Sequence, residues 1–251
     1  MIHIFLPAYN EEKGLAALLS RLPAVMAFST EPWRVVVVDD GSRDRTAEVA
    51  TSFRDRFDVH LIRFDRNRGV GDAFREGLRS ICASSPTPER DICITLDSDN
   101  TQDPEKIPAM VEKIRSGTDI VIASRFRRGG GMIGCPWKRV LFSNAVSLFM
   151  RTLTRLPGVR DFSTFYRAFR VSILIEAFDR YGDRLLSGKG FAAAGGLLLK
   201  TAALTSHISE VPSVLRFELK SGRSGIKISR TVRGYLELML DYVLTRGYRK
   251  F

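Results

Sequence analysis

The sequence contains few residues that cross-link a chain or hold a structural metal. Three of its 251 residues are cysteines, Cys82, Cys93 and Cys135, and no two of them form a Cys-x-x-Cys pair. An odd number of scattered thiols argues against a disulfide framework and against a zinc ribbon. Free thiols are typical of a reducing compartment, so we expect a cytoplasmic protein.

Long hydrophobic runs are also missing. The longest apolar candidate covers residues 140–150 and includes Ser143 and Asn144, whereas a membrane-spanning helix needs roughly 18 apolar residues. No basic leader precedes the first apolar run, residues 2–6, so we expect no signal peptide. If the protein works at a membrane, we expect it to be peripheral, at the cytoplasmic face.

Acidic residues are outnumbered by basic ones. The 39 lysines and arginines against 28 aspartates and glutamates give a formal net charge of +11. This balance favours anionic partners: nucleic acid, phosphate-rich ligands or an anionic membrane surface. We expect no nucleic-acid partner, because the aromatic residues do not alternate with basic ones as in a stacking platform.

Apolar runs alternate with helical patterns in the first half of the chain. Continuous Val- and Ile-rich runs are typical of strands buried on both faces of a parallel sheet. Their alternation with helices predicts βαβ units in a doubly wound α/β fold, which binds ligands beyond the carboxyl ends of its strands. We expect strands over residues 2–6, 34–39, 59–64, 91–97 and 119–124, and helices over residues 11–28, 43–56, 70–83 and 104–115.

The second half changes character. A basic, glycine-rich loop is expected over residues 125–139, followed by helices over 138–154 and 171–180, a further helix after 185–200, and an extended segment over 206–219. We therefore divide the chain into a catalytic domain, residues 1–218, and a basic amphipathic segment, residues 219–251. Within the domain, residues 1–124 form a nucleotide half and residues 125–218 an acceptor half, and we do not expect the halves to fold independently.

Two carboxylates follow the fourth predicted strand, Asp97 and Asp99. Strand side chains alternate with a period of two, so both can project together where the strand ends. Paired carboxylates with an open side suit Mg²⁺ or Mn²⁺, which often share their ligands with substrate phosphates. The alternative is a solvated turn before a helix that starts at Asp103 and Pro104.

Polar residues also follow the first three predicted strands. Tyr9 and Glu11 follow the first strand and Asp40 ends the second, and each group taken alone fits a helix cap or a strand-to-helix turn. Gly69 and Gly71 after the third strand resemble part of a dinucleotide fingerprint. Phe74 stands where its third glycine belongs, which argues against an NAD enzyme.

The order of these segments carries more information than any one of them. LPAYNEE, VVVVDDGSRDRT, NRGVGDAFREG, LDSDNTQDP and ASRF, followed by WKRVLFSNAVSLFMRTL, VRDFSTFYRAFR, GKGF and SEVPSVLR, resemble the inverting glycosyltransferases of family 2, in their dolichyl- or polyprenyl-phosphate mannose synthase branch. The resemblance covers residues 2–245. It implies the α/β fold called GT-A, a mostly parallel central sheet with helices on both faces, here with a C-terminal amphipathic helix.

The resemblance also implies roles for particular residues. It implies Asp99, Arg125 and Asp161 as catalytic residues, and Asp97, Asp99 and Gln102 around the Mg²⁺ or Mn²⁺. Gln102 stands one position later than in the family, and the family's lysine near residues 222–225 is missing, so that Lys220 or Lys227 would have to replace it. Nucleotide binding is implied for Pro7, Tyr9, Glu11, Val38, Asp40, Asp97 and Ser98, and phosphate or acceptor binding for Arg125, Ser163, Arg167 and Arg216, to which the basic loop adds the candidates Arg127, Arg128, Lys138 and Arg139.

The expected reaction moves a hexose, mannose or glucose-like, from a GDP- or UDP-sugar to a polyprenyl phosphate with inversion. A phosphate nucleophile is already anionic at neutral pH, so it needs no general base. A saccharide or other hydroxyl acceptor is the alternative, and it would need a base, for which Asp161 is the candidate. The basic segment 226–251 either lies on an anionic membrane or packs on its own domain, on a second copy or on a membrane-protein partner.

Overall fold

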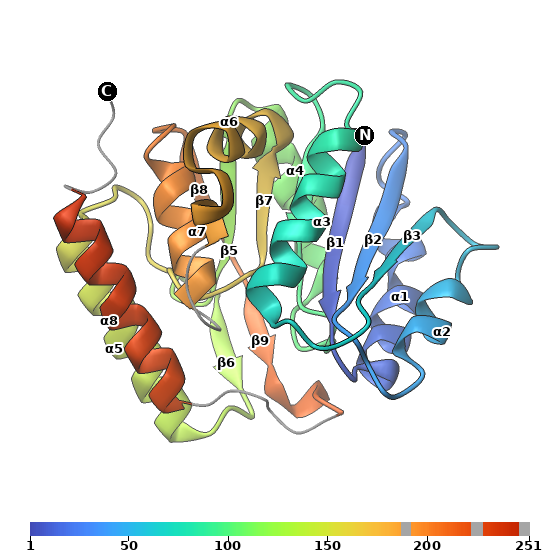
Figure 1. The fold of residues 1–251 in the computed structure, drawn as a ribbon, viewed down its shortest axis with the longest axis horizontal. Coiled ribbons are helices and arrows are strands. Elements are labelled where there is room, and N and C mark those ends of the chain that lie inside the picture. The colour runs from blue at the N-terminus through green and yellow to red at the C-terminus, as the bar shows by residue number, and fades with distance from the viewer. Residues whose placement is uncertain (187–191, 222–227, 246–251) are drawn as a thin grey trace.

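The computed structural model describes residues 1–186, 192–221 and 228–245 (Figure 1). Its main sheet has seven strands in the order β3-β2-β1-β4-β7-β5-β8, and all neighbours run parallel except at β7. The fold class predicted from the sequence is confirmed. The strands are β1 (Ile2–Ala8), β2 (Trp33–Asp39), β3 (Val59–Arg63), β4 (Ile92–Thr95), β5 (Ile120–Ser124), β7 (Arg167–Arg170) and β8 (Ile208–Pro212).

Helices cover both faces of the sheet (Figure 1). One core holds α1 and α4 against one set of strand side chains, and the other holds α3, α6 and α7 against the alternate set. Thus Val35 and Val37 of β2 face one core, and Val36 and Val38 face the other. The helices are α1 (Glu12–Met26), α2 (Thr46–Thr51), α3 (Val70–Ser84), α4 (Ile107–Arg115), α5 (Trp137–Thr154), α6 (Val171–Tyr181), α7 (Ala192–Ala202) and α8 (Ile228–Leu244), with 3₁₀ turns at Pro104–Lys106, Gly182–Leu186 and Phe217–Leu219.

The structure differs from the predicted elements in four places. The further helix, expected after residues 185–200, is α7, which already begins at Ala192. The helix expected over 43–56 spans only Thr46–Thr51, because the Asp39 and Asp44 carboxylates accept backbone N–H bonds from Ser42 and Thr46 and hold the preceding residues in a turn. β7, which was not predicted, enters the sheet antiparallel between β4 and β5. The basic loop contains β6 (Gly131–Ile133), which pairs with β9 (Val214–Arg216).

The C-terminal helix α8 packs on the domain with one face. Tyr235, Leu238 and Met239 are buried, and a Cβ added at Gly195 of α7 would lie 3.0 Å from Leu238. Its other face exposes Val232, Leu236, Leu240, Val243 and Leu244. None of the described helices is long and apolar enough to cross a membrane.

Candidate active site

The loops after β1, β2 and β4 meet at one cavity of about 410 Å³, which we call the strand-end cavity. This is where a doubly wound sheet binds its ligands. A smaller pocket of about 30 Å³, the inner pocket, adjoins it and shares four of its lining residues, Asp97, Arg139, Phe165 and Leu215. Of the predicted site residues, Pro7, Tyr9, Glu11, Asp40, Asp97, Ser98, Asp99 and Arg139 line the strand-end cavity, together with Lys220.

Side-chain hydrogen bonds hold the loops after β1 and β2. Asn10 adopts a left-handed φ of 54°, and its backbone N–H donates to Ser42 Oγ at 2.9 Å. The Glu11 N–H donates to Thr46 Oγ1 at 2.9 Å. The Asp40 carboxylate accepts the N–H groups of Arg68 and Gly69 at 2.6 and 2.9 Å, which ties the loop after β2 to the loop before α3. These bonds fix the loops that carry the cavity-lining residues Tyr9, Glu11, Asp40 and Gly69.

The loop after β4 presents Asp97 and Asp99 to the cavity. Ser98 Oγ donates to the Pro7 carbonyl at 2.8 Å, which joins this loop to the end of β1. Gln102 accepts from the Asp97 N–H at 2.9 Å and donates from Nε2 to Asp97 Oδ2 at 2.7 Å. Gln102 lines the inner pocket but not the strand-end cavity, so it supports Asp97 from behind.

Lys220 brings a cation to these carboxylates. Its Nζ lies 2.6 Å from Asp99 Oδ2 and 3.3 Å from Glu11 Oε1. Asp99 Oδ1 meanwhile accepts from Thr101 Oγ1 at 2.6 Å. Burial and the neighbouring Asp99 raise the pKa of Asp97 to about 7, and burial raises the pKa of Glu11. Crowded carboxylates of this kind need a counter-cation in order to stay ionised.

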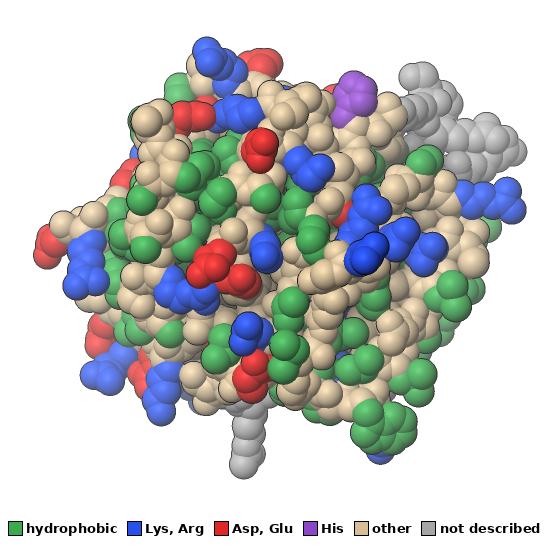
Figure 2. Space-filling view, turned by 180° about the vertical axis from the view of Figure 1, so that it is seen from behind, with side chains coloured by type: hydrophobic (Ala, Val, Ile, Leu, Met, Phe, Trp, Pro, Cys, Tyr) green, Lys and Arg blue, Asp and Glu red, His purple; other side chains and the backbone are tan. Residues whose placement is uncertain are grey.

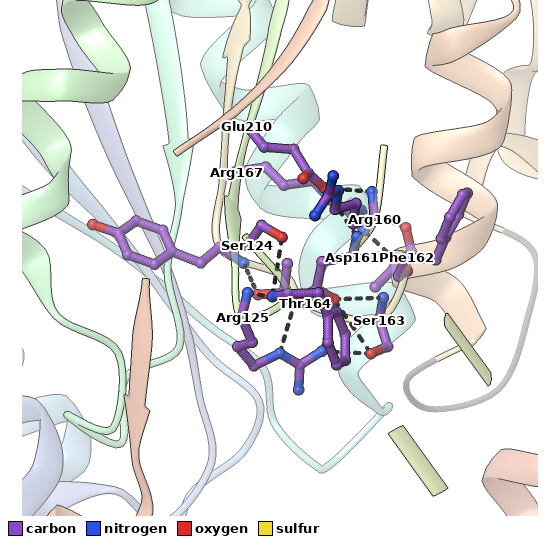
Figure 3. A network of polar contacts seen from close by, with 12 residues as sticks. Ser124, Arg125, Arg160, Asp161, Phe162, Ser163, Thr164, Arg167 and Glu210 are labelled. Carbon is purple, nitrogen blue, oxygen red and sulfur yellow. Dashed lines mark hydrogen bonds and ion pairs between the residues drawn. The ribbon is translucent and has the colours of Figure 1, made fainter. Parts of the chain in front are cut away.

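Arg125 is held by a buried carboxylate at the edge of the inner pocket (Figure 3). Its Nε and Nη2 donate to Asp161 at 2.8 and 2.7 Å, and Nη2 also donates to Ser163 Oγ at 2.6 Å. Burial acts to lower the pKa of Arg125, but the Asp161 carboxylate outweighs it and the pKa is raised. The Asp161 side chain has no exposed surface, so it positions Arg125 and does not face the cavity as a predicted catalytic residue would.

Several predicted contacts are not where the sequence placed them. The prediction that Arg167 binds phosphate is wrong for this structure, because its side chain is wholly buried and donates to the carbonyls of Ala194 and Phe162. Val38 is buried in the sheet and does not line the cavity. Arg127 pairs with Glu210 at 3.4 Å and lines a separate surface cavity. Arg128, Lys138 and Arg216 are exposed and line neither the strand-end cavity nor the inner pocket.

Other residues of the cavity were not predicted. Asn67, Thr101 and Phe165 line it; each lies in one of the quoted segments, but none of them was given a role. Thr101 carries one usable signal, because it lies two residues after Asp99, the spacing at which a hydroxyl bonds a carboxylate. Lys220 was one of two lysines considered, and the other, Lys227, lies outside the described residues together with residues 222–225.

Comparisons with known proteins identify the family. The profile described as "Glycosyl transferase family 2" matches residues 3–178, and the chain belongs to this family. Undecaprenyl-phosphate mannosyltransferase from Micrococcus luteus is 32% identical over 208 residues, 82% of this chain and 80% of that protein. Dolichol-phosphate mannosyltransferase from Pyrococcus furiosus is 32% identical over 160 residues, 64% of this chain and 42% of that protein.

Other relatives are longer than this chain. An undecaprenyl-phosphate 4-deoxy-4-formamido-L-arabinose transferase from Pectobacterium atrosepticum is 31% identical over 184 residues, 71% of this chain and 52% of that protein. The chain therefore spans about half of the length of this relative and less than half of the Pyrococcus protein. Glucosyl-3-phosphoglycerate synthase from Mycobacterium tuberculosis, solved with Mn²⁺, UDP-glucose and phosphoglyceric acid, has the same fold, with a TM-score of 0.69, 20% identity, and coverage of 100% of this chain and 81% of that one.

Proposed function

We propose that the protein transfers a hexose from a nucleotide diphosphate sugar to a polyprenyl phosphate with inversion at the anomeric carbon. The observation that carries the proposal is that Arg139 lines both the strand-end cavity, where Asp97 and Asp99 lie, and the inner pocket, where Arg125 lies. The strand-end cavity would hold the donor diphosphate and the inner pocket the acceptor phosphate, and the two would meet at Arg139. Relatives named as transferases of undecaprenyl or dolichol phosphate support this acceptor.

The strand-end cavity suits the nucleotide. Tyr9 is 43% exposed at its mouth and offers a ring to a base. Asp40 and Glu11 offer carboxylate oxygens to ribose hydroxyls, and Lys220 stands beside Glu11 for the diphosphate. A cavity of about 410 Å³ lies in the range of small-molecule sites.

The residues present also fit a divalent cation. Asp97 and Asp99 supply oxygen donors, the ligands that Mg²⁺ and Mn²⁺ prefer. Burial, followed by the neighbouring Asp99, raises the pKa of Asp97, so a bound cation would favour its ionised form. When bound, the ion would neutralise charge on the leaving diphosphate. Gln102 would hold Asp97 in place, since its side-chain amide accepts from the Asp97 N–H through Oε1 and donates to Asp97 Oδ2 through Nε2.

The acceptor phosphate would bind between Arg125 and Arg139. The bonds of Arg125 to Asp161 fix its guanidinium before substrate arrives, so little entropy is lost on binding. In the reaction an acceptor phosphate oxygen attacks the anomeric carbon, and the bond from that carbon to the nucleoside diphosphate oxygen breaks. The bonding pair leaves with the diphosphate, and no proton has to be removed.

A hydroxyl acceptor fits this site less well. It needs a general base, and Asp161 has no exposed side-chain surface. Although burial acts in the opposite sense, Arg125 holds the pKa of Asp161 below its usual range. A weakly basic, enclosed carboxylate cannot take a proton from a substrate hydroxyl.

Transfer of radiolabelled sugar to a detergent-dispersed polyprenyl phosphate tests the proposal. GDP-mannose, UDP-glucose and related donors are each assayed with that acceptor and with soluble saccharides. We expect a lipid-phosphate product from one donor, with the anomer inverted in an NMR time course. A retained anomer, or transfer to saccharides alone, would contradict the proposal.

A further inference from the structure

The C-terminal end of α5 and the loop after it form a second cavity of about 420 Å³, which we call the arginine cavity. None of its described lining residues also lines the strand-end cavity or the inner pocket. Four arginines line it, Arg127, Arg151, Arg155 and Arg160, and no acidic residue stands among its described lining. They come from the loop after β5, from the last turn of α5 and from the loop before β7, so a single helix end does not explain them.

Three of these arginines have no counter-charge in the described parts of the chain. Arg151, Arg155 and Arg160 are exposed, and no ion pair joins them to any residue of 1–186, 192–221 or 228–245. Arg127 alone of the four forms an ion pair within the described residues, with Glu210 at 3.4 Å. Guanidinium groups gathered around one cavity repel each other until an anion binds, and phosphate oxygens match their planar donors.

The backbone beneath the cavity is fixed from the interior. Glu210, whose side chain has no exposed surface, accepts the N–H groups of Arg160 and Asp161 at 2.6 and 2.9 Å. Figure 3 shows Glu210 and Arg160 on one side of Asp161 and Arg125 on the other. One short segment therefore presents Arg160 to the arginine cavity and Asp161 to Arg125, so the two sites are separate but share a scaffold.

The backbone conformation of Arg155 also supports a binding role for the arginine cavity. Arg155 ends α5 with a left-handed φ of 49°. Glycine adopts this conformation at a free-energy cost about 1 kcal/mol lower than arginine does. The chain nevertheless carries an arginine here, and its side chain lines the cavity. A purely structural helix end would gain stability from glycine at this position.

Apolar surface lies next to the arginines. Leu148, one turn before Arg151, lines the cavity and is 62% exposed, and Phe149, the next residue of α5, is 50% exposed. Figure 2 shows Lys and Arg side chains gathered close to hydrophobic ones on this face of the molecule. A free phosphate would use the arginines alone, whereas a lipid uses both surfaces.

We propose that the arginine cavity binds the phosphate headgroup of an anionic phospholipid, with the acyl chains against Leu148 and Phe149. This site is distinct from the acceptor site, and the inference goes beyond the proposed transfer reaction without depending on it. Bound lipid would orient the domain on the membrane from which a polyprenyl phosphate is drawn. It would also neutralise the arginines on the loop that carries Asp161.

Vesicle flotation with the whole chain tests this inference. Vesicles of phosphatidylcholine are compared with vesicles that also contain phosphatidylglycerol, for the wild type and for Arg151→Gln/Arg155→Gln/Arg160→Gln. The matched control removes the same charge elsewhere, at Arg56, Arg90 and Lys113. We expect the wild type to prefer the anionic vesicles, the cavity variant to bind them at least about tenfold more weakly, and the control to bind as the wild type does.

Two further measurements distinguish lipid binding from the transfer reaction and from binding of free phosphate. Transfer to a detergent-dispersed acceptor should be unchanged in the cavity variant, which keeps this test apart from that of the proposed reaction. Titration with inorganic phosphate and with glycerol 3-phosphate should show much weaker binding than the vesicles do. Equal losses in both triple variants, wild-type indifference to phosphatidylglycerol, or phosphate binding as tight as vesicle binding would each overturn the inference.

Discussion

Lys220 Nζ lies 2.6 Å from Asp99 Oδ2, although the two residues are 121 positions apart in the chain. The contact brings the segment after β9 over the end of β4, and Glu11 at the start of α1 joins it at 3.3 Å. Three distant segments thus share one charge cluster. The negative charge of a bound donor would therefore interact with all three segments at once.

Removal of Lys220 should therefore weaken donor binding. Charge-assisted hydrogen bonds of this kind contribute about 1.5–3 kcal/mol, so Lys220→Gln should raise the Kd of the nucleotide sugar about ten- to a hundredfold. Titration calorimetry measures this, with Lys113→Gln as a control. A donor affinity unchanged by Lys220→Gln would show that the lysine serves only to balance the carboxylates.

Gly14 of α1 should be needed for the shape of the Asp97–Asp99 loop. A Cβ at this position would lie 2.8 Å from Asp99 Cα and 2.9 Å from the Ser98 carbonyl oxygen, both backbone atoms that cannot rotate away. Gly14→Ala should destabilise the fold by about 1–3 kcal/mol and reduce donor affinity. Gly131→Ala is the control in urea unfolding, because no atom of the described residues lies within 4 Å of a Cβ added there. Equal stability of the two variants would contradict the close packing at Gly14.

Asp161 should act through Arg125. Asp161→Asn leaves a buried guanidinium without its counter-charge, which costs about 3–5 kcal/mol in other proteins. We expect a large loss of stability in thermal unfolding and a rise in the KM for the acceptor. If Asp161 were instead a general base, the variant would lose kcat and the acidic limb of its pH–rate profile would disappear.

His3 should limit stability in acid. It is wholly buried, neither ring nitrogen has a hydrogen-bond partner among the described residues, and burial, followed by Arg34, lowers its pKa from 6.5 to about 4. Between pH 6.5 and 4, His3 is protonated in the unfolded chain but neutral in the folded one. The free energy of unfolding therefore falls as the pH drops from 6.5 towards 4, by up to about 3 kcal/mol. Urea unfolding of His3→Leu should show a smaller fall over this range, and His60→Gln should behave as the wild type does.

The sequence predicted the first half of the fold well because its strands are continuous Val and Ile runs. β7 could not be predicted, because arginines at both of its ends, Arg167 and Arg170, interrupt the apolar pattern. Arg167 shows the same limit for the site: a motif identifies an arginine but not whether its side chain faces substrate or the core. Lys220 is brought to Asp99 by the tertiary fold, which no local spacing reveals. The roles of the cavity residues remain predictions.

The most direct test of the account is metal-dependent binding of the donor. Calorimetric titration of GDP- and UDP-sugars is carried out with Mn²⁺, with Mg²⁺ and with EDTA, for the wild type, Asp97→Asn, Asp99→Asn and the exposed control Asp55→Asn. We expect one donor to bind at least about tenfold more tightly with metal, and this gain to be lost in Asp97→Asn and Asp99→Asn but kept in the control. Donor binding that ignores both EDTA and the two substitutions would contradict the account.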